Sequence, residues 1–538
     1  MSRSAWVAIV AGTLALSAPA IVAQDSTAVT ADTMRSGEVD WGDIVGNVVV
    51  VLPAPDMPRD PVFRASPLLP FEHWAVQAAR RAEALGLTRF FPAQRSVPRA
   101  QVARALDEAV RNATSPTLMS VAEGWRARFV EEFPEHAHAS ASRTRGGVTL
   151  LAARAEVGAE RWTGRLAPAV GYSTVRQPPQ PLADVSGPAA ALSLGAATEW
   201  TSLSAEGAYR GGEAVLRQWD AAVGFGAFQL SVGRAPLGYG WGRMGSVVYA
   251  SPDAVPRIEL QSTRPFRLPW ILRHVGPVTL HTFAGPVNDP ARHPTGPELW
   301  GMRVAARPHP RLTLGANRGS MFGGDDDPTT VSRIVKMLIG VVRSRFENQV
   351  ISFDARYRLP TDRALPLTAY VEWGADDAAG ALDETPGRVV GLFAPALPGV
   401  PEVGVGVEHA YFKAACCGHG PWYLNSTFPG NWAAHGRPLG HPVGGEGAEY
   451  AGYLQAELME ARLRLHARGF VRDRSEKSLP FYGGGNLYTP ARTGRSTGGA
   501  VDAALRLAPR AELRAAGWLD HGDGWREQRL SASLAWTF

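Results

Sequence analysis

Hydrophobic and polar residues alternate with a period of two along most of the chain, from about Ser142 to the last residue. In Asn348–Leu359 the apolar positions are Ile351, Phe353, Ala355, Tyr357 and Leu359, and the polar positions are Ser352, Asp354, Arg356 and Arg358. Residues Ala461–Arg468 follow the same pattern. This period predicts β-strands. A charged second face is typical of a half-exposed sheet or of a membrane barrel with a polar lumen.

The final strand distinguishes between these two architectures. Leu534 and Trp536 fall on one face of Leu530–Phe538, and serine and threonine residues fall on the other. The chain ends on an aromatic residue, at the rim where a membrane barrel places its aromatic girdle. A C-terminal strand that ends in phenylalanine is similar to the recognition signal of bacterial outer-membrane barrels. The pattern therefore favours an all-β transmembrane barrel.

The length of chain after Ser142 predicts the number of strands. Roughly 395 residues follow it, and a strand with its share of loops takes about 20–25 residues, so we expect about 16–18 antiparallel strands. Long polar insertions alternate with tight turns such as Gly211-Gly212 and Met459-Glu460. The insertions are Gln177–Pro188, Gly285–Pro297, Phe322–Ser332, Gly374–Arg388 and Phe412–Glu449. We expect long loops on one side of the barrel, facing out, and short turns on the other side.

A small helical bundle is predicted before the barrel. The stretch Pro70–Leu85 has apolar residues at helical spacing, and Gly86 ends it. A second helix is predicted to start at Ser96, and a third to run from 115 or 116 to 133. Their apolar faces are small, so we expect a bundle that docks on another part of the molecule.

The first segment has the layout of a secretory signal peptide. A basic residue, Arg3, precedes an apolar run from Ala5 to about Ala18, and Ala23 closes a small-residue cleavage site. The alternative, a single membrane-anchoring helix, needs about 20 apolar residues, more than this run provides. The predicted organisation is a signal peptide at 1–23, a linker at 24–64, a periplasmic helical bundle at 65–140 and an outer-membrane barrel at 143–538.

Composition excludes several classes of protein. After the first segment, no stretch approaches the eighteen or so apolar residues of a membrane helix. The net charge is +5, and its basic residues are dispersed, so we expect no nucleic-acid partner. The adjacent Cys416 and Cys417 exclude a disulfide framework and leave a vicinal disulfide or two free thiols. Without a Gly-x-Ser-x-Gly elbow or a Walker-type loop, we predict no enzyme and no cofactor. The spacings of His409, His419, His435 and His441 match no standard zinc pattern, so we predict no metal site.

Two segments contain candidate binding chemistry. The glycines of Gly233–Arg257 allow its backbone to approach another surface. The loop Trp422–His441 combines aromatic faces, amides, histidines and an arginine, which are the groups that sugar recognition needs. Alternatively, its tryptophans belong to an interfacial girdle and its glycines let the loop fold over the barrel mouth. The candidate glycan-binding residues are Trp422, Tyr423, Asn425, Trp432, His435, Arg437 and His441.

The chain resembles the capsule assembly Wzi family over most of its length. The resemblance lies in "SPLLPFEHWAVQAARRAEALGL", "GRAPLGYGWGRMGSVVYASPDAVPRIEL", "LWGMRVAARPHPRLTLGANRGSMFGG" and "HGRPLGH". The residues that match the family's first motifs, with a structural role, are Trp241, Gly242, Ser251, Asp253, Ala254 and Pro256. Asp253 stands where the family pattern has asparagine, and His435 where it has arginine. These departures bear on the ligand more than on the fold.

The resemblance implies an outer-membrane barrel of about eighteen strands with a periplasmic helical bundle. It implies a surface lectin that tethers capsular or extracellular polysaccharide and helps capsule assembly. Outer-membrane lipid and the barrel assembly machinery would be its further partners. The same helices also resemble half of an S-layer-homology repeat. That gives the alternative of a porin-type channel whose periplasmic module binds the cell wall.

Overall fold

The structure is a computed structural model. It describes residues 64–136, 147–163, 187–210, 213–288, 296–324, 329–338, 347–362, 364–376, 387–412, 422–423, 432–434, 437–443, 446–474 and 494–538. The predicted signal peptide, nearly all of the predicted linker, and the two cysteines lie outside these residues. No helix in the described ranges is long and apolar enough to span a membrane.

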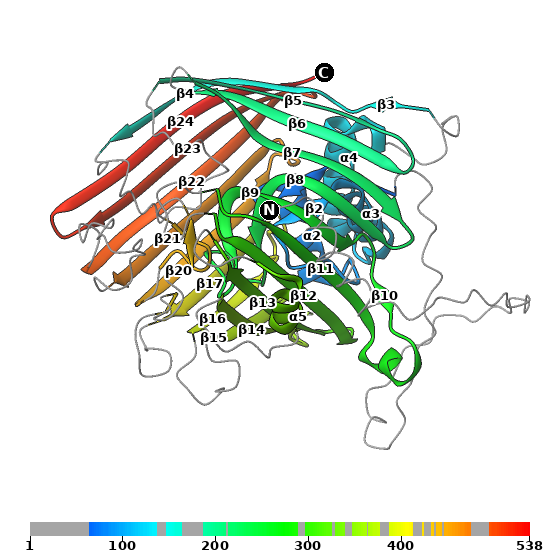
Figure 1. The fold of residues 1–538 in the computed structure, drawn as a ribbon. Helices are drawn as coiled ribbons and strands as arrows, with labels where there is room; N and C mark the ends of the chain where they lie inside the picture. Colours follow the sequence, from blue (N-terminus) through cyan, green and yellow to red (C-terminus); the bar gives the residue numbers. More distant parts are fainter. Residues whose placement is uncertain are drawn as a thin grey trace, which may run out of the picture.

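Eighteen long antiparallel strands form a closed barrel (Figure 1). They are β4 (Arg154–Thr163), β5 (Gly187–Ala197), β6 (Thr201–Arg210), β7 (Glu213–Phe225), β8 (Phe228–Gly238), β9 (Ala250–Ser262), β11 (Pro277–Pro286), β12 (Glu298–His309), β13 (Leu312–Phe322), β14 (Glu347–Arg358), β15 (Thr368–Asp376), β16 (Gly387–Ala394), β17 (Val403–Tyr411), β20 (Gly447–Leu458), β21 (Leu463–Arg474), β22 (Gly494–Ala508), β23 (Ala511–Gly522) and β24 (Trp525–Thr537). Two short strands, β3 (Thr149–Leu150) and β10 (Phe266–Arg267), extend the same sheet.

The barrel closes where its last strand pairs with its first. β24 pairs antiparallel with β4, with Leu534 opposite Val157. β9 pairs directly with β11, and β17 pairs directly with β20. Closure leaves no open sheet edge, which is the condition for a sheet to cross lipid. The predicted all-β barrel and its strand number are confirmed.

The two faces of the wall follow the alternation in the sequence. In β24, Leu534 and Trp536 are exposed on the outer face, where lipid would lie. In β14, Phe353 is exposed, whereas its neighbours Asp354 and Arg356 are buried inside. Apolar side chains therefore point outward and charged side chains point into the lumen, as the period-two pattern predicted.

The two ends of the barrel differ in their connections. We call the end that carries the Met459-Glu460 connection the turn end, and the opposite end the loop end. All five predicted long insertions lie at the loop end. The β6–β7 connection at Gly211-Gly212 also lies at the loop end, because strand direction alternates from β6. The prediction that this connection lies at the turn end was wrong, because short connections occur at both ends of the barrel.

Three helices precede the barrel, as predicted. They are α2 (Trp74–Leu85), α3 (Arg99–Asn112) and α4 (Pro116–Glu132), followed by the short 3-10 helix η2 (Pro134–His136). Gly86 ends α2 in the left-handed conformation, with φ of 77°, which glycine adopts without a steric penalty. Ser115 caps α4 by accepting a hydrogen bond from the N–H of Leu118, and Pro116 follows at the first helical position.

The second helix begins three residues later than predicted. Residues Ser96–Pro98 form strand β2, which pairs with β1 (Leu68–Pro70). Proline disfavours a helical conformation in the residue before it, so the helix starts only at Arg99. The small sheet places the N-terminus of α3 beside Pro67, whose carbonyl accepts a hydrogen bond from the N–H of Arg99 at 2.8 Å.

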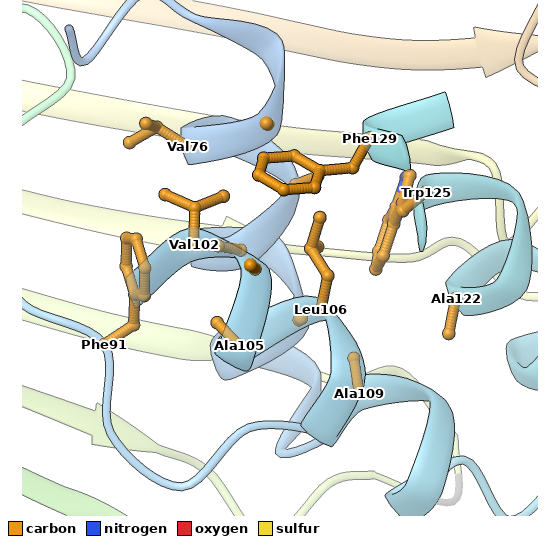
Figure 2. Close-up of a cluster of buried hydrophobic side chains, with 14 of the residues drawn as sticks. Val76, Phe91, Val102, Ala105, Leu106, Ala109, Ala122, Trp125 and Phe129 are labelled. Atoms are coloured by element: carbon orange, nitrogen blue, oxygen red, sulfur yellow. The ribbon is translucent and has the colours of Figure 1, made fainter. Parts of the chain in front are cut away.

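The helices share one apolar core. Figure 2 shows Val102 and Leu106 of α3 between Val76 of α2 and the rings of Trp125 and Phe129 of α4. These side chains are buried. Burying large apolar side chains stabilises such a bundle by about 1.5–3 kcal/mol each.

The helical bundle docks on the inner surface of the barrel at the turn end. Arg81 of α2 donates a hydrogen bond to the carbonyl of Pro395, at 2.6 Å, and forms an ion pair with Glu457 of β20. Glu83 forms an ion pair with Arg356 of β14. Figure 1 shows α2, α3 and α4 enclosed by the strands rather than separate from them. The partner expected for the bundle is therefore the barrel itself.

Candidate functional site

The predicted aromatic loop enters the barrel instead of projecting from it. Trp432 is 0% exposed and Trp422 is 1% exposed. The indole N–H of Trp432 donates a hydrogen bond to the carbonyl of Val248, at 2.7 Å. The hydroxyl of Tyr423 donates to the carbonyl of Val247, also at 2.7 Å. These rings therefore fill the interior near the loop end.

Residues 239–249, the glycine-rich segment, form the surface on which the loop packs. A Cβ atom on Gly245 would lie 2.2 Å from Cδ2 of His441, and one on Gly440 would lie 2.1 Å from the Tyr423 hydroxyl. Neither position can hold a larger residue without displacing its neighbour. The glycines of this segment were predicted to allow its backbone to approach another surface. That surface is the loop.

Backbone hydrogen bonds hold the loop together and join it to the wall. The N–H of Trp432 donates to the carbonyl of Tyr423 at 2.9 Å, and the N–H of Leu439 donates to the carbonyl of Trp432 at 3.0 Å. Two short strands, β18 (Ala433–Ala434) and β19 (Arg437–Pro438), pair between them. The N–H of Ala250, at the start of β9, donates to the carbonyl of Leu439 at 2.6 Å.

The seven candidate glycan-binding residues divide into two groups. Trp422, Tyr423, Trp432 and His441 are buried against the protein, so their faces are occupied by protein atoms rather than presented to a ligand. Trp422, Tyr423 and Trp432 are not girdle residues on the lipid face either, because they pack in the inner cluster with Tyr249 and Phe283. Asn425, His435 and the side chain of Arg437 lie outside the described residues. Glycan binding by this loop stays a prediction.

The family-motif residues line the same interior. The ring of Trp241 is buried, and the guanidinium of Arg356 lies over it at 4.4 Å. A Cβ atom on Gly242 would meet the carbonyl oxygen of Gly245 at 1.8 Å, so this position requires glycine. Ser251 and Ala254 are buried in β9, and Pro256 is half-buried. The side chain of Asp253 lies outside the described residues.

Polar pairs inside the barrel hold the glycine-rich segment in place. The carboxylate of Glu408, on β17, accepts hydrogen bonds from the N–H groups of Arg243 and Met244, at 2.6 and 2.9 Å. It also accepts one from the hydroxyl of Tyr370, at 2.7 Å. Sequence analysis did not identify Glu408. The signal available was a lone glutamate on the inward face of a predicted strand, which must find a partner when buried.

A cavity of about 540 Å³ lies between the helices and the wall formed by β4–β7 and β20–β24. Small residues of the wall leave this space open, and arginines outnumber acidic residues among its described lining. The arginines are Arg99, Arg154, Arg217, Arg243, Arg464, Arg468, Arg514 and Arg529. The acidic residues are Glu72, Glu132, Glu156, Glu160, Glu206 and Asp502.

Glu132, at the end of α4, links the helices to the cavity wall. It accepts a hydrogen bond from the indole of Trp74, at 2.5 Å, and forms an ion pair with Arg154 of β4, at 2.9 Å. Burial raises the pKa of Glu132, but the charges and hydrogen bonds of its neighbours hold that pKa well below its usual value. Burial lowers the pKa of the adjacent His73, whose ring is 3.3 Å from the carboxylate.

Comparison with known protein families identifies the chain. The model of the capsule assembly protein Wzi family matches residues 132–518, which is most of the chain. The chain belongs to the Wzi family. The family resemblance read from the sequence motifs is confirmed.

A solved member of the family has the same fold. The Wzi protein of Escherichia coli is 18% identical, with a TM-score of 0.67 over 88% of this chain and 100% of that chain. It is described as an outer membrane protein involved in group 1 capsule assembly and as a carbohydrate-binding β-barrel. OprD of Pseudomonas aeruginosa is 8% identical, with a TM-score of 0.42 over 74% of this chain and 97% of that chain. No curated protein sequence matches the chain.

Proposed function

We propose that this protein is an outer-membrane barrel that binds capsular or extracellular polysaccharide at the cell surface and helps capsule assembly. The observation that carries the proposal is the match of the Wzi family model to residues 132–518, together with a closed barrel of the same fold as the carbohydrate-binding Escherichia coli protein. Polysaccharide and outer-membrane lipid are its partners in this proposal, and the barrel assembly machinery inserts it.

The proposed orientation places the loop end outside the cell and the turn end, where the helices dock inside the barrel, on the periplasmic side. Its support is the asymmetry of the connections, since outer-membrane barrels carry short turns on the periplasmic side and longer loops outside. All five predicted long insertions are at the loop end, and α2, α3 and α4 dock at the turn end. The proposed organisation keeps a leader at 1–23, a linker at 24–64 and a bundle at 65–140 before the barrel.

We propose binding rather than catalysis. Inward charged groups such as Arg303 and Asp354 are engaged with each other, at 2.5 and 3.0 Å, and the carboxylate of Asp354 also accepts a hydrogen bond from Asn317. Carboxylates held in this way by charged neighbours brace the wall. They are poor candidates for proton transfer to a substrate.

In this proposal the loop 412–449 contacts the glycan with its polar residues. The buried rings of Trp422, Tyr423 and Trp432 anchor the loop in the barrel. The contacts to sugar then come from Asn425, His435 and Arg437, with the guanidinium suited to a uronate carboxylate.

A test should separate residues that anchor the loop in the barrel from residues that contact the glycan. Arg437→Ala should leave the barrel assembled and cause cells to shed an acidic polysaccharide into the medium, because a hydrogen bond to a charged group contributes about 1.5–3 kcal/mol. Arg437→Lys should restore part of the retention. Trp432→Ala should also shed polysaccharide, but with a destabilised barrel, since removing a buried tryptophan costs about 3–5 kcal/mol.

The readouts are the polysaccharide retained on cells and the heat-modifiable migration of the protein on gels. Trp200→Ala serves as the control, because Trp200 lies at the turn end. An assembled Arg437→Ala variant that keeps its polysaccharide as well as the parent would show that this residue does not contact the glycan. Shedding by the Trp200→Ala variant would show that the loss is nonspecific.

A further inference from the structure

The connection between β9 and β11 carries an exposed apolar tip at the turn end. It contains β10 and the 3-10 helix η4 (Trp270–Val275), whereas β7 and β8 are joined there by only two residues. Trp270 is 89% exposed, Ile271 80% and Leu272 52%. Each of these side chains would bury apolar area if it found an environment away from water.

The tip continues the lipid-facing wall. β10 pairs with β11, with Phe266 opposite Val278. The ring of Phe266 packs on that of Phe228, with centroids 5.2 Å apart, and Phe228 lies 6.2 Å from Phe225. These rings make an aromatic row on the outer face at the turn end. Aromatic residues gather in this way at the interface between membrane and water.

The charge around the tip has one sign. Arg264, Arg267, Arg273 and His274 lie between residues 262 and 277, and this stretch contains no aspartate or glutamate. Arg267 and Arg273 are exposed. Neither forms an ion pair with a residue that the structure describes. A basic, aromatic and acid-free surface is complementary to anionic phospholipid headgroups.

The backbone of the tip is strained at Trp270. Trp270 has φ of 55°, in the left-handed region that bulky residues rarely adopt. Such a conformation persists where surrounding contacts hold it. The side chain of Trp270 is almost fully exposed, so its contacts within this protein are few.

We propose that residues 264–275 insert their apolar tip into the headgroup region of the phospholipid leaflet at the turn end, with Arg267 and Arg273 on lipid phosphates. The tip then anchors one side of the barrel rim and fixes its depth in the bilayer. This anchoring is separate from glycan binding and depends on the proposed function only for which leaflet it contacts.

The test measures the depth of the tip in the full-length protein. Ile271→Cys is introduced into a Cys416→Ser, Cys417→Ser background, spin-labelled and reconstituted into vesicles of phosphatidylethanolamine and phosphatidylglycerol. The label should be accessible to oxygen and shielded from a water-soluble nickel complex. A label at Ser120→Cys, on the exposed side of α4, provides the aqueous control.

Charge variants test the role of the arginines. In the vesicles that contain phosphatidylglycerol, Arg267→Gln and Arg273→Gln should each lower the ratio of membrane-immersed to water-exposed label by about fivefold. They should have little effect in vesicles of phosphatidylcholine alone. Arg510→Gln, in the exposed β22–β23 turn, is the matched control and should change nothing. Heat-modifiable migration checks that each variant is folded.

A label at Ile271→Cys that is as accessible to nickel as the Ser120→Cys label would overturn the proposal and leave the tip as a surface for a water-soluble partner. Equal depth in both lipid compositions would overturn the part assigned to Arg267 and Arg273. The vesicles contain no polysaccharide, so these outcomes are independent of whether the glycan-binding proposal succeeds.

Discussion

The side chain of Trp432 determines how its loop sits in the barrel. Its ring packs on Tyr249, with centroids 5.1 Å apart, and against Gly319, where a Cβ atom would lie 2.7 Å from the indole. The N–H of the same ring bonds to Val248, which is 184 residues away in the chain. One residue thus joins the loop, the glycine-rich segment and the wall.

Gly245→Ala should weaken this junction. The new Cβ atom would clash with the ring of His441, and overpacking of a filled interior costs about 1–3 kcal/mol. The expected result is a lower temperature for the heat-induced gel shift. Gly207→Ala is the matched control, because nothing lies within 4 Å of a Cβ atom there. Equal transition temperatures for the two variants would contradict the packing described for Gly245.

The candidate site was only partly predictable from sequence. The residue types of the loop and the need for glycine in the facing segment were both visible, because each follows from the local sequence. The direction of the rings was not, because the groups that bury Trp432 and Tyr423 lie on distant parts of the chain. Glu408 was missed for the same reason, since its partners Arg243 and Met244 are 165 and 164 residues away.

Among the elements, local signals predicted most of the secondary structure. The strands followed the period of two. Gly86 caps the end of α2, and Ser115 caps the start of α4, as the chemistry of these two residues favours. The helix α5 (Val331–Leu338) was missed, since it overlaps a segment predicted as a polar insertion. Ile334 and Met337 of α5 pack with Trp300 of β12, a contact that no local pattern shows.

Docking of the helices should weaken at acidic pH. The pKa of His73 is lowered by burial, so an unfolded or undocked His73 binds a proton more readily, and docking is lost as pH falls below the ordinary value of 6.5. The pKa of Glu132 is also depressed, so its contribution is present above its ordinary value of 4.5 and is lost as pH falls further. Both groups shift stability in the same direction.

Hydrogen exchange of the α2 amides, corrected for the intrinsic pH dependence, measures this effect. Exchange should be faster at pH 5.5 than at pH 7.5. His73→Asn keeps an acceptor that can cap α2, whose N-cap is His73, and removes the titrating group, so it should abolish the difference. An undiminished pH dependence in this variant would assign the effect to another group.

At the scale of the whole molecule, one part of the barrel interior is tightly packed and another part contains a cavity. The aromatic loop packs with residues of the wall from β8 to β17. The arginine-lined cavity lies between the helices and the wall formed by β4–β7 and β20–β24. The sequence patterns predicted a charged lumen but not this division. It depends on helices that bond to strands more than 300 residues away, such as Arg128 of α4 to Glu512 of β23.

We expect little conductance from the intact protein in planar bilayers, because the helices close the turn end. Deletion of residues 65–136 should produce larger and steadier single-channel currents if the remaining barrel assembles, which heat-modifiable migration checks. Large, steady currents from the intact protein would instead favour the porin-type alternative. The cell-wall-binding role in that alternative stays a prediction.

The seam between β24 and β4 has a consequence for the order of assembly. The hydroxyl of Ser533 bonds to Glu156, 377 residues earlier, and the N–H of Phe538 bonds to the carbonyl of Ala153. Contacts with such separation form slowly, because much of the chain must be ordered before they add any stability. The helices precede β4, so they are already synthesised while the seam is open. Closing the seam therefore completes the wall around the helices, and it can occur only after β24, the last strand of the barrel, has been synthesised.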